Sequence, residues 1–518
     1  MSQMSPSTPA SATSAPAPDR ADTEAHPHKE HGSVRLVIAS VAVLLLLASL
    51  DQTIVSTALP TIVADLGGLE HLSWVVTAYI LASTVVAPLY GKLGDLYGRR
   101  NVVIVSVTLF LFGSVLCGLS GSMGFLIMAR ALQGLGGGGL FVLALSIIGD
   151  VIPPKERGKI QGVFAGVFGL SSVAGPLLGG WFVDALSWHW IFFINLPVGA
   201  LALSGFVFGF KPRGVRTQHK IDYPGALTLS LTLSSLVLLT ALGGKEFGLT
   251  DPIGLGLMAL FVMALVSFVR IEGKASEPIL PITLFKMNIF AVTTVISFIS
   301  GALMFGTLTF IPMFLQLAKG ASATQSGLQL IPMTFGILLS STIAGQYMGR
   351  TGRYRVLPMI GLSLASVSLL SLSRLSPEMP SWQIWLSLAG MGAGMGCIFP
   401  VVTTAVQNAV ERHQIGTATA AGLMFRQVGA SIAVALFGAL FAARMARLMG
   451  EAHVEGLSNV AELGPQILAT LPEDTKALIA ETISTALHPI YWIAAGLALA
   501  GLMLSFFLRE IPLRSRES

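Results

Sequence analysis

Long apolar stretches separated by short polar connections dominate the chain. Fourteen stretches stand out, at residues 36–59, 73–91, 102–120, 123–149, 160–183, 190–210, 224–243, 253–270, 289–317, 326–348, 356–373, 381–408, 417–443 and 488–508. Most lack the period-two alternation of barrel strands, so the pattern predicts helices. Because about 20 apolar residues cross a bilayer, we expect an all-α polytopic membrane protein with 14 transmembrane helices.

Composition agrees with this class. The 518 residues are 53% hydrophobic and 11% charged, whereas soluble domains carry about 25% charged residues. Cys117 and Cys397 lie inside apolar stretches, which favours buried thiols over a disulfide or metal site. In a membrane protein the net charge of +5 matters through the placement of basic residues, and no nucleic-acid partner is expected.

The basic residues predict the orientation. With the N-terminus inside, the cytoplasmic segments hold 23 of the 31 Lys and Arg residues, the outer segments hold six, and Arg130 and Arg426 lie within helices. This bias favours cytoplasmic termini. Residues 1–33, rich in Ser, Ala and Pro, are expected to be a disordered tail. An outer segment at 444–487 ends in a predicted amphipathic helix, interpreted as a packed cover rather than a substrate site.

An internal repeat relates the two ends of the chain. Gly91, Gly98 and Arg99 match Gly345, Gly352 and Arg353 at a common offset of 254. The repeat predicts an N-terminal six-helix half at residues 34–211 and a linker with an inserted helix pair at 212–287. A C-terminal six-helix half at 288–510 and a short cytoplasmic tail at 511–518 follow. Paired halves around a midplane site are the design of secondary transporters.

Asp51 is the one acidic residue well inside an apolar stretch. A carboxylate there costs about 2.5–3.5 kcal/mol on insertion scales, so it must face protein or water. We expect Asp51 to carry the proton if protons drive transport; the alternative is a carboxylate fixed in a permanent buried network. Arg130 lies at about the same depth and could pair with it, or be held only by backbone carbonyls and Gln133.

Two further motifs have structural roles. Asp95 can cap a nearby helix N-terminus. Two arginines beside it can bond acids or helix C-termini in the other half, or serve only as positive charges on the inner side. These cytoplasmic latch residues are Gly91, Asp95, Gly98, Arg99 and Arg100. In the second half Gly349 replaces the aspartate, so a weaker latch or none is expected. A glycine–proline motif should break and bend the fifth helix; it comprises Gly175, Pro176, Gly179 and Gly180.

These motifs resemble the major facilitator superfamily and, within it, the fourteen-helix drug:proton antiporters. The resemblance rests on the 91–100 loop, on the motifs at 50–60, 130–134 and 169–180, and on Trp188–Pro197. It covers residues 34–510 and implies the major facilitator fold. It further implies proton-coupled export by alternating access in the bacterial cytoplasmic membrane, with the proton gradient rather than a cofactor as energy source.

The central cavity is expected to have apolar and amide walls. Candidate lining residues are Gln52, Tyr79, Gln133, Phe305, Phe310, Gln316, Gln407, Asn408 and Arg426. With one deep acid, neutral or singly charged lipophiles fit better than divalent cations, and Arg426 would accommodate an anion. Besides these small substrates, the partners expected are protons and membrane lipids. Export of a lipid or metabolite remains open, and so does proton-coupled uptake, which the glycine–proline motif disfavours.

Enzymatic function has little support in the sequence. Gly134–Gly139 formally matches a dinucleotide-binding pattern, but no strand precedes it and it lies in an apolar helix. Phosphate-loop, HExxH and serine-hydrolase motifs are not found. We therefore expect a secondary transporter without a metal site.

Overall fold

A computed structural model describes residues 28–67, 71–210, 222–244, 246–248, 250–451 and 473–513. Within these ranges the chain is helical and has no strand, apart from one isolated bridge between Gly243 and Phe247. The all-α class expected from the sequence is therefore confirmed. The predicted tail 1–33 lies mostly outside the described residues, although helix α1 already begins at His28.

The N-terminal half contains seven helical segments in the described part of the chain. They are α1 (His28–Leu66), α2 (Leu72–Tyr97), α3 (Arg99–Gly118), α4 (Met123–Val151), α5 (Pro154–Ala185), α6 (Trp190–Phe193) and α7 (Asn195–Gly209). The short α6 and α7 together occupy the sixth predicted span. The inserted pair is α8 (Tyr223–Leu242) and α9 (Pro252–Glu272).

The C-terminal half follows a short 3₁₀ helix, η2 (Ile282–Lys286). Its elements are α10 (Asn288–Leu317), α11 (Ala323–Leu328), α12 (Ile331–Thr351), α13 (Val356–Leu372), α14 (Ser381–Ala409), η3 (Arg412–Gln414), α15 (Ile415–Glu451) and α17 (Glu473–Ser505). Twelve helical segments in the described ranges are long and apolar enough to span a membrane. The remaining two predicted spans fall on α5 and α13, so the count of fourteen stays a prediction.

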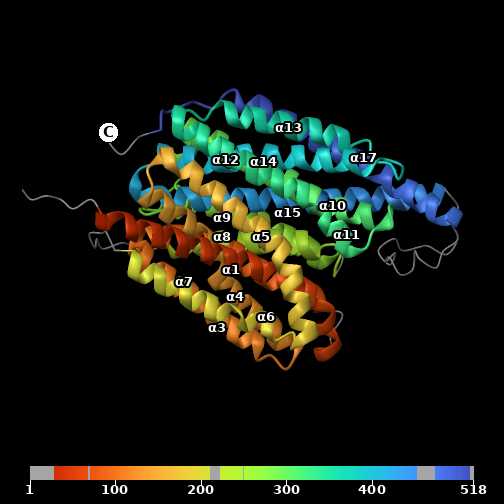
Figure 1. Ribbon diagram of the computed structural model, residues 1–518, viewed down its shortest axis with the longest axis horizontal. Helices are drawn as coiled ribbons and strands as arrows, with labels where there is room; N and C mark the ends of the chain where they lie inside the picture. The colour runs from red at the N-terminus through yellow and green to blue at the C-terminus, as the bar shows by residue number, and fades with distance from the viewer. Residues whose placement is uncertain are drawn as a thin grey trace, which may run out of the picture.

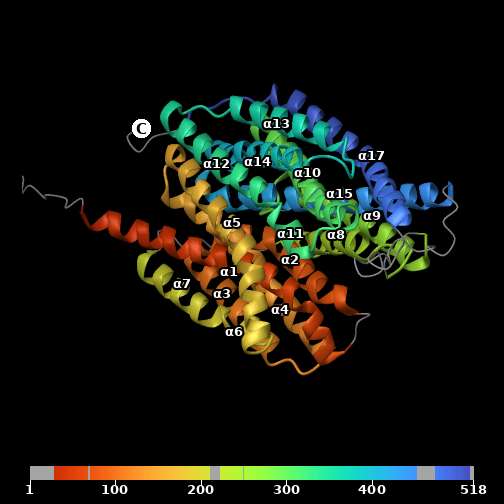
Figure 2. The same cartoon turned by 45° about the vertical axis from the view of Figure 1, so that its right-hand side comes forward.

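The two halves lie side by side and meet mainly near one end of the bundle (Figures 1 and 2). The described part of the chain ends there, at Leu513. We call it the inner end, because the basic residues predict that it faces the cytoplasm. There α2 packs against α15 and α5 packs against α12. The structure is therefore closed at its inner end.

Glycines make these two contacts close. A Cβ atom on Gly91 of α2 would lie 2.6 Å from the carbonyl oxygen of Gly416 in α15. A Cβ atom on Gly345 of α12 would lie 2.3 Å from the backbone carbon of Gly158 in α5. Gly91 and Gly345 are equivalent positions in the sequence repeat, so the two contacts are related by the same internal symmetry. Only glycine allows backbones to approach this closely.

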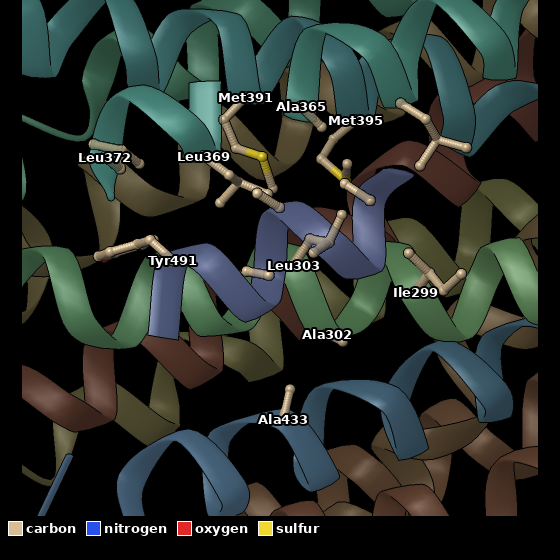
Figure 3. Close-up of a cluster of buried hydrophobic side chains, with 14 of the residues drawn as sticks. Ile299, Ala302, Leu303, Ala365, Leu369, Leu372, Met391, Met395, Ala433 and Tyr491 are labelled. Carbon is tan, nitrogen blue, oxygen red and sulfur yellow. The ribbon is translucent and has the colours of Figure 1, made fainter. Parts of the chain in front are cut away.

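The core of the C-terminal half is apolar and rich in methionine. Side chains from α10, α13, α14 and α17 converge there, among them Leu303, Leu369, Met391, Met395 and Tyr491 (Figure 3). All five are at most 1% exposed. Flexible methionine side chains fill the gaps between helices that cross at different angles.

The outer segment differs from its prediction. Residues 444–451 extend α15, and residues 473–487 form the start of α17 rather than a separate surface helix. Ile479, Ile483 and Leu487 are fully buried in the C-terminal core, as the interpretation of a packed cover requires. Residues 452–472 lie outside the described chain.

The C-terminal residues 510–513 are hydrogen-bonded to the rest of the C-terminal half. Glu510 accepts hydrogen bonds from the backbone N–H groups of Tyr354 and Arg355, just before α13. The Leu513 N–H donates to the carbonyl of Gly352. This segment therefore ties the loop between α12 and α13 to the end of α17.

Replacing Gly345 with leucine should open the inner end, because the new side chain cannot fit against Gly158. We expect a single cysteine introduced at Thr342, in a background where Cys117 and Cys397 are alanine, to react several-fold faster with a polar thiol reagent. Gly438→Leu is the matched control, since a Cβ atom there meets nothing within 4 Å. Equal reactivity in both variants would show that the glycine contact does not hold the inner end shut.

Candidate functional site: a buried ion pair at the centre of the N-terminal half

Asp51 is 1% exposed and accepts hydrogen bonds from three side chains. Arg130 Nη1 donates to Oδ2 at 2.7 Å. Gln133 Nε2 and Asn195 Nδ2 donate to Oδ1 at 2.8 and 2.9 Å. The carboxylate thus has a full set of donors from α4 and α7, which compensates for the loss of water around a buried charge.

Arg130 is held on several sides. Besides Asp51, its guanidinium donates to Gln133 Oε1 at 2.6 Å and to the carbonyl of Val75 at 3.4 Å. It lies 4.3 Å from the ring centroid of Tyr79 and 5.8 Å from that of Phe192. Contact with aromatic faces stabilises a desolvated cation. Arg130 and Asp51 therefore form a closed, electrically neutral unit inside the half.

Helix packing sets this geometry. Gly113 of α3 lies so close to α4 that a Cβ atom would be 2.5 Å from Gln133 Cα. Ser114, the next residue, therefore reaches Gln133 Nε2 at 2.8 Å. On the other side, the break between α6 and α7 places Asn195 at the first position of α7, from which its amide points at Asp51.

Contacts from both interpretations of Arg130 are present together. The pairing with Arg130 is present, and so are the bonds from Arg130 to Gln133 and to a carbonyl. Sequence reasoning missed Ser114 and Asn195 as members of the network. The signal for Asn195 was a lone amide within the apolar run of Trp188–Pro197; Ser114 gave no signal that separates it from other serines in apolar helices.

Asp95 performs the capping expected of it. Its carboxylate accepts from the Gly416 N–H at 3.0 Å and from the Thr417 N–H at 2.7 Å, and also from the Thr417 hydroxyl at 3.0 Å. These are the first backbone donors of α15, in the other half of the molecule, where a negative charge is favoured. Gly98, with φ +86°, makes the turn that follows α2.

The two arginines of the latch stay within their own half, contrary to the expectation. Arg99 bonds Asp95 and, at 2.9 Å, Asp150 Oδ2. Arg100 donates to the carbonyl of Val207 near the end of α7. Of the three charged latch residues, Asp95 therefore is the one seen to hydrogen-bond the other half, because the arginine side chains bond nearer acids and carbonyls.

Arg157 closes the inner end of α4. It donates to the carbonyls of Ile152 and Gly149 at 2.8 and 2.5 Å, satisfying groups that the end of the helix leaves unpaired. Burial lowers the pKa of Arg157 to about 10, because desolvation disfavours its charged form. The group remains cationic at neutral pH.

The predicted break in α5 is wrong, because the helix continues through Pro176 from Pro154 to Ala185. Gly175 makes a close approach to α1: a Cβ atom would lie 2.0 Å from Thr53 Oγ1. Thr53 in turn donates to the Ser171 carbonyl at 3.2 Å. Gly180 has open space beside it. The motif therefore couples α5 to the segment of α1 that carries Asp51.

Most of the predicted cavity residues lie elsewhere in this inner-closed structure. Tyr79 and Gln133 belong to the Asp51 network. Phe310 packs its ring against Phe437 and Phe441 in the C-terminal core. Gln316 donates to Ser326 near the outer end.

Two more amides lie at the inner end. Gln407 donates to the Leu145 carbonyl and to Thr419, bridging α4 and α15. Asn408 donates to the carbonyls of Ile511 and Pro512. Of the remaining candidates, Gln52 and Phe305 are exposed, and Arg426 lines a small cavity that is partly open. Sequence alone could not separate cavity amides from those that join helices.

Two helical halves in a membrane, with a neutralised ion pair buried between helices, define a secondary transport protein. The described residues hold no group of three or more His, Cys, Asp or Glu that could bind a metal. The arrangement is a buried carboxylate whose charge is balanced by Arg130 within contacts between helices.

Comparison with known proteins identifies the family. Residues 41–434 match the profile of the Major Facilitator Superfamily. An uncharacterized MFS-type transporter of Mycobacterium tuberculosis is 41% identical over 469 residues, covering 90% of this chain and 68% of that protein. The Multidrug transporter protein MdtP of Bacillus subtilis is 34% identical over 513 residues, with 93% and 94% covered.

Solved structures share the fold. The structure of the proton:xylose symporter XylE aligns with a TM-score of 0.60 at 14% identity, covering 94% of this chain and 98% of that one. The chain therefore belongs to the Major Facilitator Superfamily. It is a multi-pass membrane transporter and not an enzyme.

Removing both partners of the buried pair should lower the stability of the protein by less than the sum of the two single changes. Asp51→Ala leaves Arg130 buried without a counter-charge, which costs about 3–5 kcal/mol. The double variant Asp51→Ala/Arg130→Ala should be more stable than the sum of the single changes implies, by at least about 1 kcal/mol. Thermal unfolding of the wild type, Asp51→Ala, Arg130→Ala and the double variant, all purified in one detergent, measures this coupling. Additive effects would contradict the ion pair.

Proposed function

We propose that this transporter exports lipophilic drugs or related small amphipathic compounds in exchange for protons, by alternating access. The observation that carries the proposal is the position of Asp51. It is the only acid deep within an apolar span, and it is buried against Arg130 in contacts that protonation would weaken. The name of the relative MdtP, a multidrug transporter, supports export of drugs.

The proposed cellular setting follows from the sequence and the relatives. The basic residues favour two cytoplasmic termini in a bacterial cytoplasmic membrane, and two relatives are bacterial. In that setting protons flow inward down their gradient. A carrier with one deep carboxylate would use this flow without a cofactor and would move its substrate outward.

Protonation of Asp51 would act first on α1. Loss of the negative charge removes the attraction to Arg130 and converts one carboxylate oxygen from acceptor to donor. Arg130 keeps its bonds to Gln133 and Val75, so α4 stays in place while α1 becomes free to shift.

Helix α5 would carry this shift to the inner end. Two residues from Asp51, Thr53 contacts Gly175 and Ser171 of α5. The opposite part of the same helix contains Gly158, which contacts Gly345 of α12 at the closed inner end. A single continuous helix therefore joins the proton site to the contact that must open when the substrate enters from inside.

Asp51→Asn should abolish proton-driven export, because the amide cannot take up a proton. The protein should still fold, although Arg130 loses its counter-charge, because the amide oxygen still accepts from Gln133 and Asn195 and Arg130 keeps its bonds to Gln133 and Val75. In proteoliposomes with an imposed pH gradient, we expect substrate accumulation to fall to the level of empty vesicles, whereas exchange without a gradient continues. Asp65→Asn is the matched control. It is the same substitution on the same helix, at an acid that bonds Trp188 rather than Arg130.

The direction of proton movement is tested in the same vesicles. Adding substrate to wild-type vesicles should dissipate the imposed pH difference across the membrane, measured as a change in internal pH. The internal pH of Asp51→Asn vesicles should not change. Export by Asp51→Asn at wild-type rates, still abolished by collapsing the pH gradient, would place the proton on another group and overturn the proposal.

A further inference from the structure

Arg426 in α15 is a deeply placed cation with no acidic partner. It lies eleven residues from the start of the helix at Ile415, about 16 Å from the inner end at 1.5 Å per residue. That depth is about the middle of the hydrocarbon layer. Its guanidinium lies 5.0 Å from the ring centroid of Phe399. Within the described residues it makes no hydrogen bond or ion pair.

A small cavity of about 20 Å³ adjoins Arg426 between α10, α14 and α15. Its wall holds six hydroxyl-bearing side chains, those of Thr293, Thr294, Ser297, Ser300, Thr403 and Thr419. The cavity lies in the C-terminal half, so it is separate from the Asp51 network of the N-terminal half. Backbone contact between α10 and α15 fixes its position, because a Cβ atom on Gly301 would lie 2.0 Å from the Arg426 carbonyl oxygen.

Three of these hydroxyls have hydrogens available for a ligand. Thr294 is 4% exposed and its Oγ1 has no partner. The Ser297 hydroxyl makes no hydrogen bond within the described chain. Thr419 Oγ1 accepts from Gln407 and donates to no described group. Thr293, Ser300 and Thr403, in contrast, donate to carbonyls of their own helix. The free groups are therefore donors, and they surround a cation.

The charges of the spans point to the same kind of ligand. Asp51 and Arg130 neutralise each other at 2.7 Å, so Arg426 contributes an uncompensated positive charge near the midplane. Burial of a cation without a counter-charge is unfavourable. The missing group is an anion that accepts several hydrogen bonds. At about 20 Å³ the cavity exceeds the roughly 10–15 Å³ that one water molecule needs, so it admits a compact head group such as a carboxylate but not a whole lipophile.

We propose that this cavity binds the anionic head group of the transported compound, with the apolar part of the compound outside it. The preferred substrates are then amphipathic monoanions, such as lipophilic carboxylates. This inference rests on the proposed export function and specifies its substrate class. A lipophilic cation would be repelled by Arg426, and a neutral compound would leave the charge of the guanidinium uncompensated.

The test uses the full-length protein in nanodiscs and three ligands with one naphthyl tail: the carboxylate, the primary amide and the methylammonium. Quenching of tryptophan fluorescence measures binding without a proton gradient. We expect the carboxylate to bind about ten- to a hundredfold more tightly than the amide, the range for hydrogen bonds to charged groups. In Arg426→Gln this ratio should fall to about one, with amide binding unchanged.

Two further variants keep the test decisive if Arg426→Gln folds poorly. Thr294→Val preserves shape but removes the unpartnered hydroxyl, and should lower the ratio of carboxylate to amide affinity several-fold. Thr307→Val is the matched control, because it is the same substitution on the same helix, outside the cavity wall, at a hydroxyl that donates to the Leu303 carbonyl. Its ratio should equal that of the wild type. Unchanged ratios in Arg426→Gln and Thr294→Val, or preference for the ammonium, would overturn the proposal.

Inorganic anions offer the same chemistry, so chloride is tested separately. Replacing gluconate with chloride should weaken carboxylate binding in the wild type and leave Arg426→Gln unaffected. Chloride that binds through Arg426 without competing with the carboxylate would overturn a substrate role for the cavity. If the carboxylate preference depends on Arg426 while export ignores the pH gradient, the proposed proton coupling fails and the substrate class stands.

Discussion

The contact between Asp51 and Arg130 is the constraint on which the N-terminal half depends. A carboxylate buried at this depth is tolerated only with complete compensation, and the compensation comes from three other helices. Helix α4 supplies Arg130 and Gln133, α7 supplies Asn195, and α3 supplies the Ser114 hydroxyl that orients both amides. Packing of these helices is therefore tied to the charge state of one residue on α1.

The two halves share an ancestry in sequence but hold the inner end closed by different means. Between α2 and α15, the carboxylate of Asp95 reaches the N-terminus of α15. At the related contact between α12 and α5, Gly349 occupies the equivalent position and its Cβ would lie 3.0 Å from the Lys155 carbonyl oxygen. Close glycine packing there leaves no room for an acid. One contact depends on charge and the other on shape.

Much of this architecture could be predicted from the sequence. Apolar length gave the helices, and the glycines at an offset of 254 gave the related halves. The cost of burying a charge singled out Asp51, and counting residues from the helix ends placed Arg130 at its depth. These arguments work because a bilayer leaves few alternatives for a buried backbone or charge.

Other features depend on rotation of helices about their axes, which such counting does not determine. Gln407 and Asn408 are neighbours in sequence, yet one bridges to α4 and the other holds the C-terminal segment. Asn195 faces Asp51 because a one-residue break separates α6 from α7. The arginines of the latch turned to nearby groups because Asp150 and the Val207 carbonyl lie within reach. Polar residues in apolar helices are thus easy to find in sequence and hard to assign to partners.

The asymmetry of charge between the halves is what assigns the two proposed sites to different halves. In the N-terminal half the charges of Asp51 and Arg130 cancel. A proton added to Asp51 would therefore give a net charge to a pair whose hydrogen bonds are already complete. In the C-terminal half Arg426 has free donors beside it and no acid. A group that must change its charge state is best isolated from the ligand, because a bound anion beside Asp51 would compete for Arg130. With the two arginines on α4 and α15, in different halves, the proposed proton site and the proposed anion site would not compete for one cation.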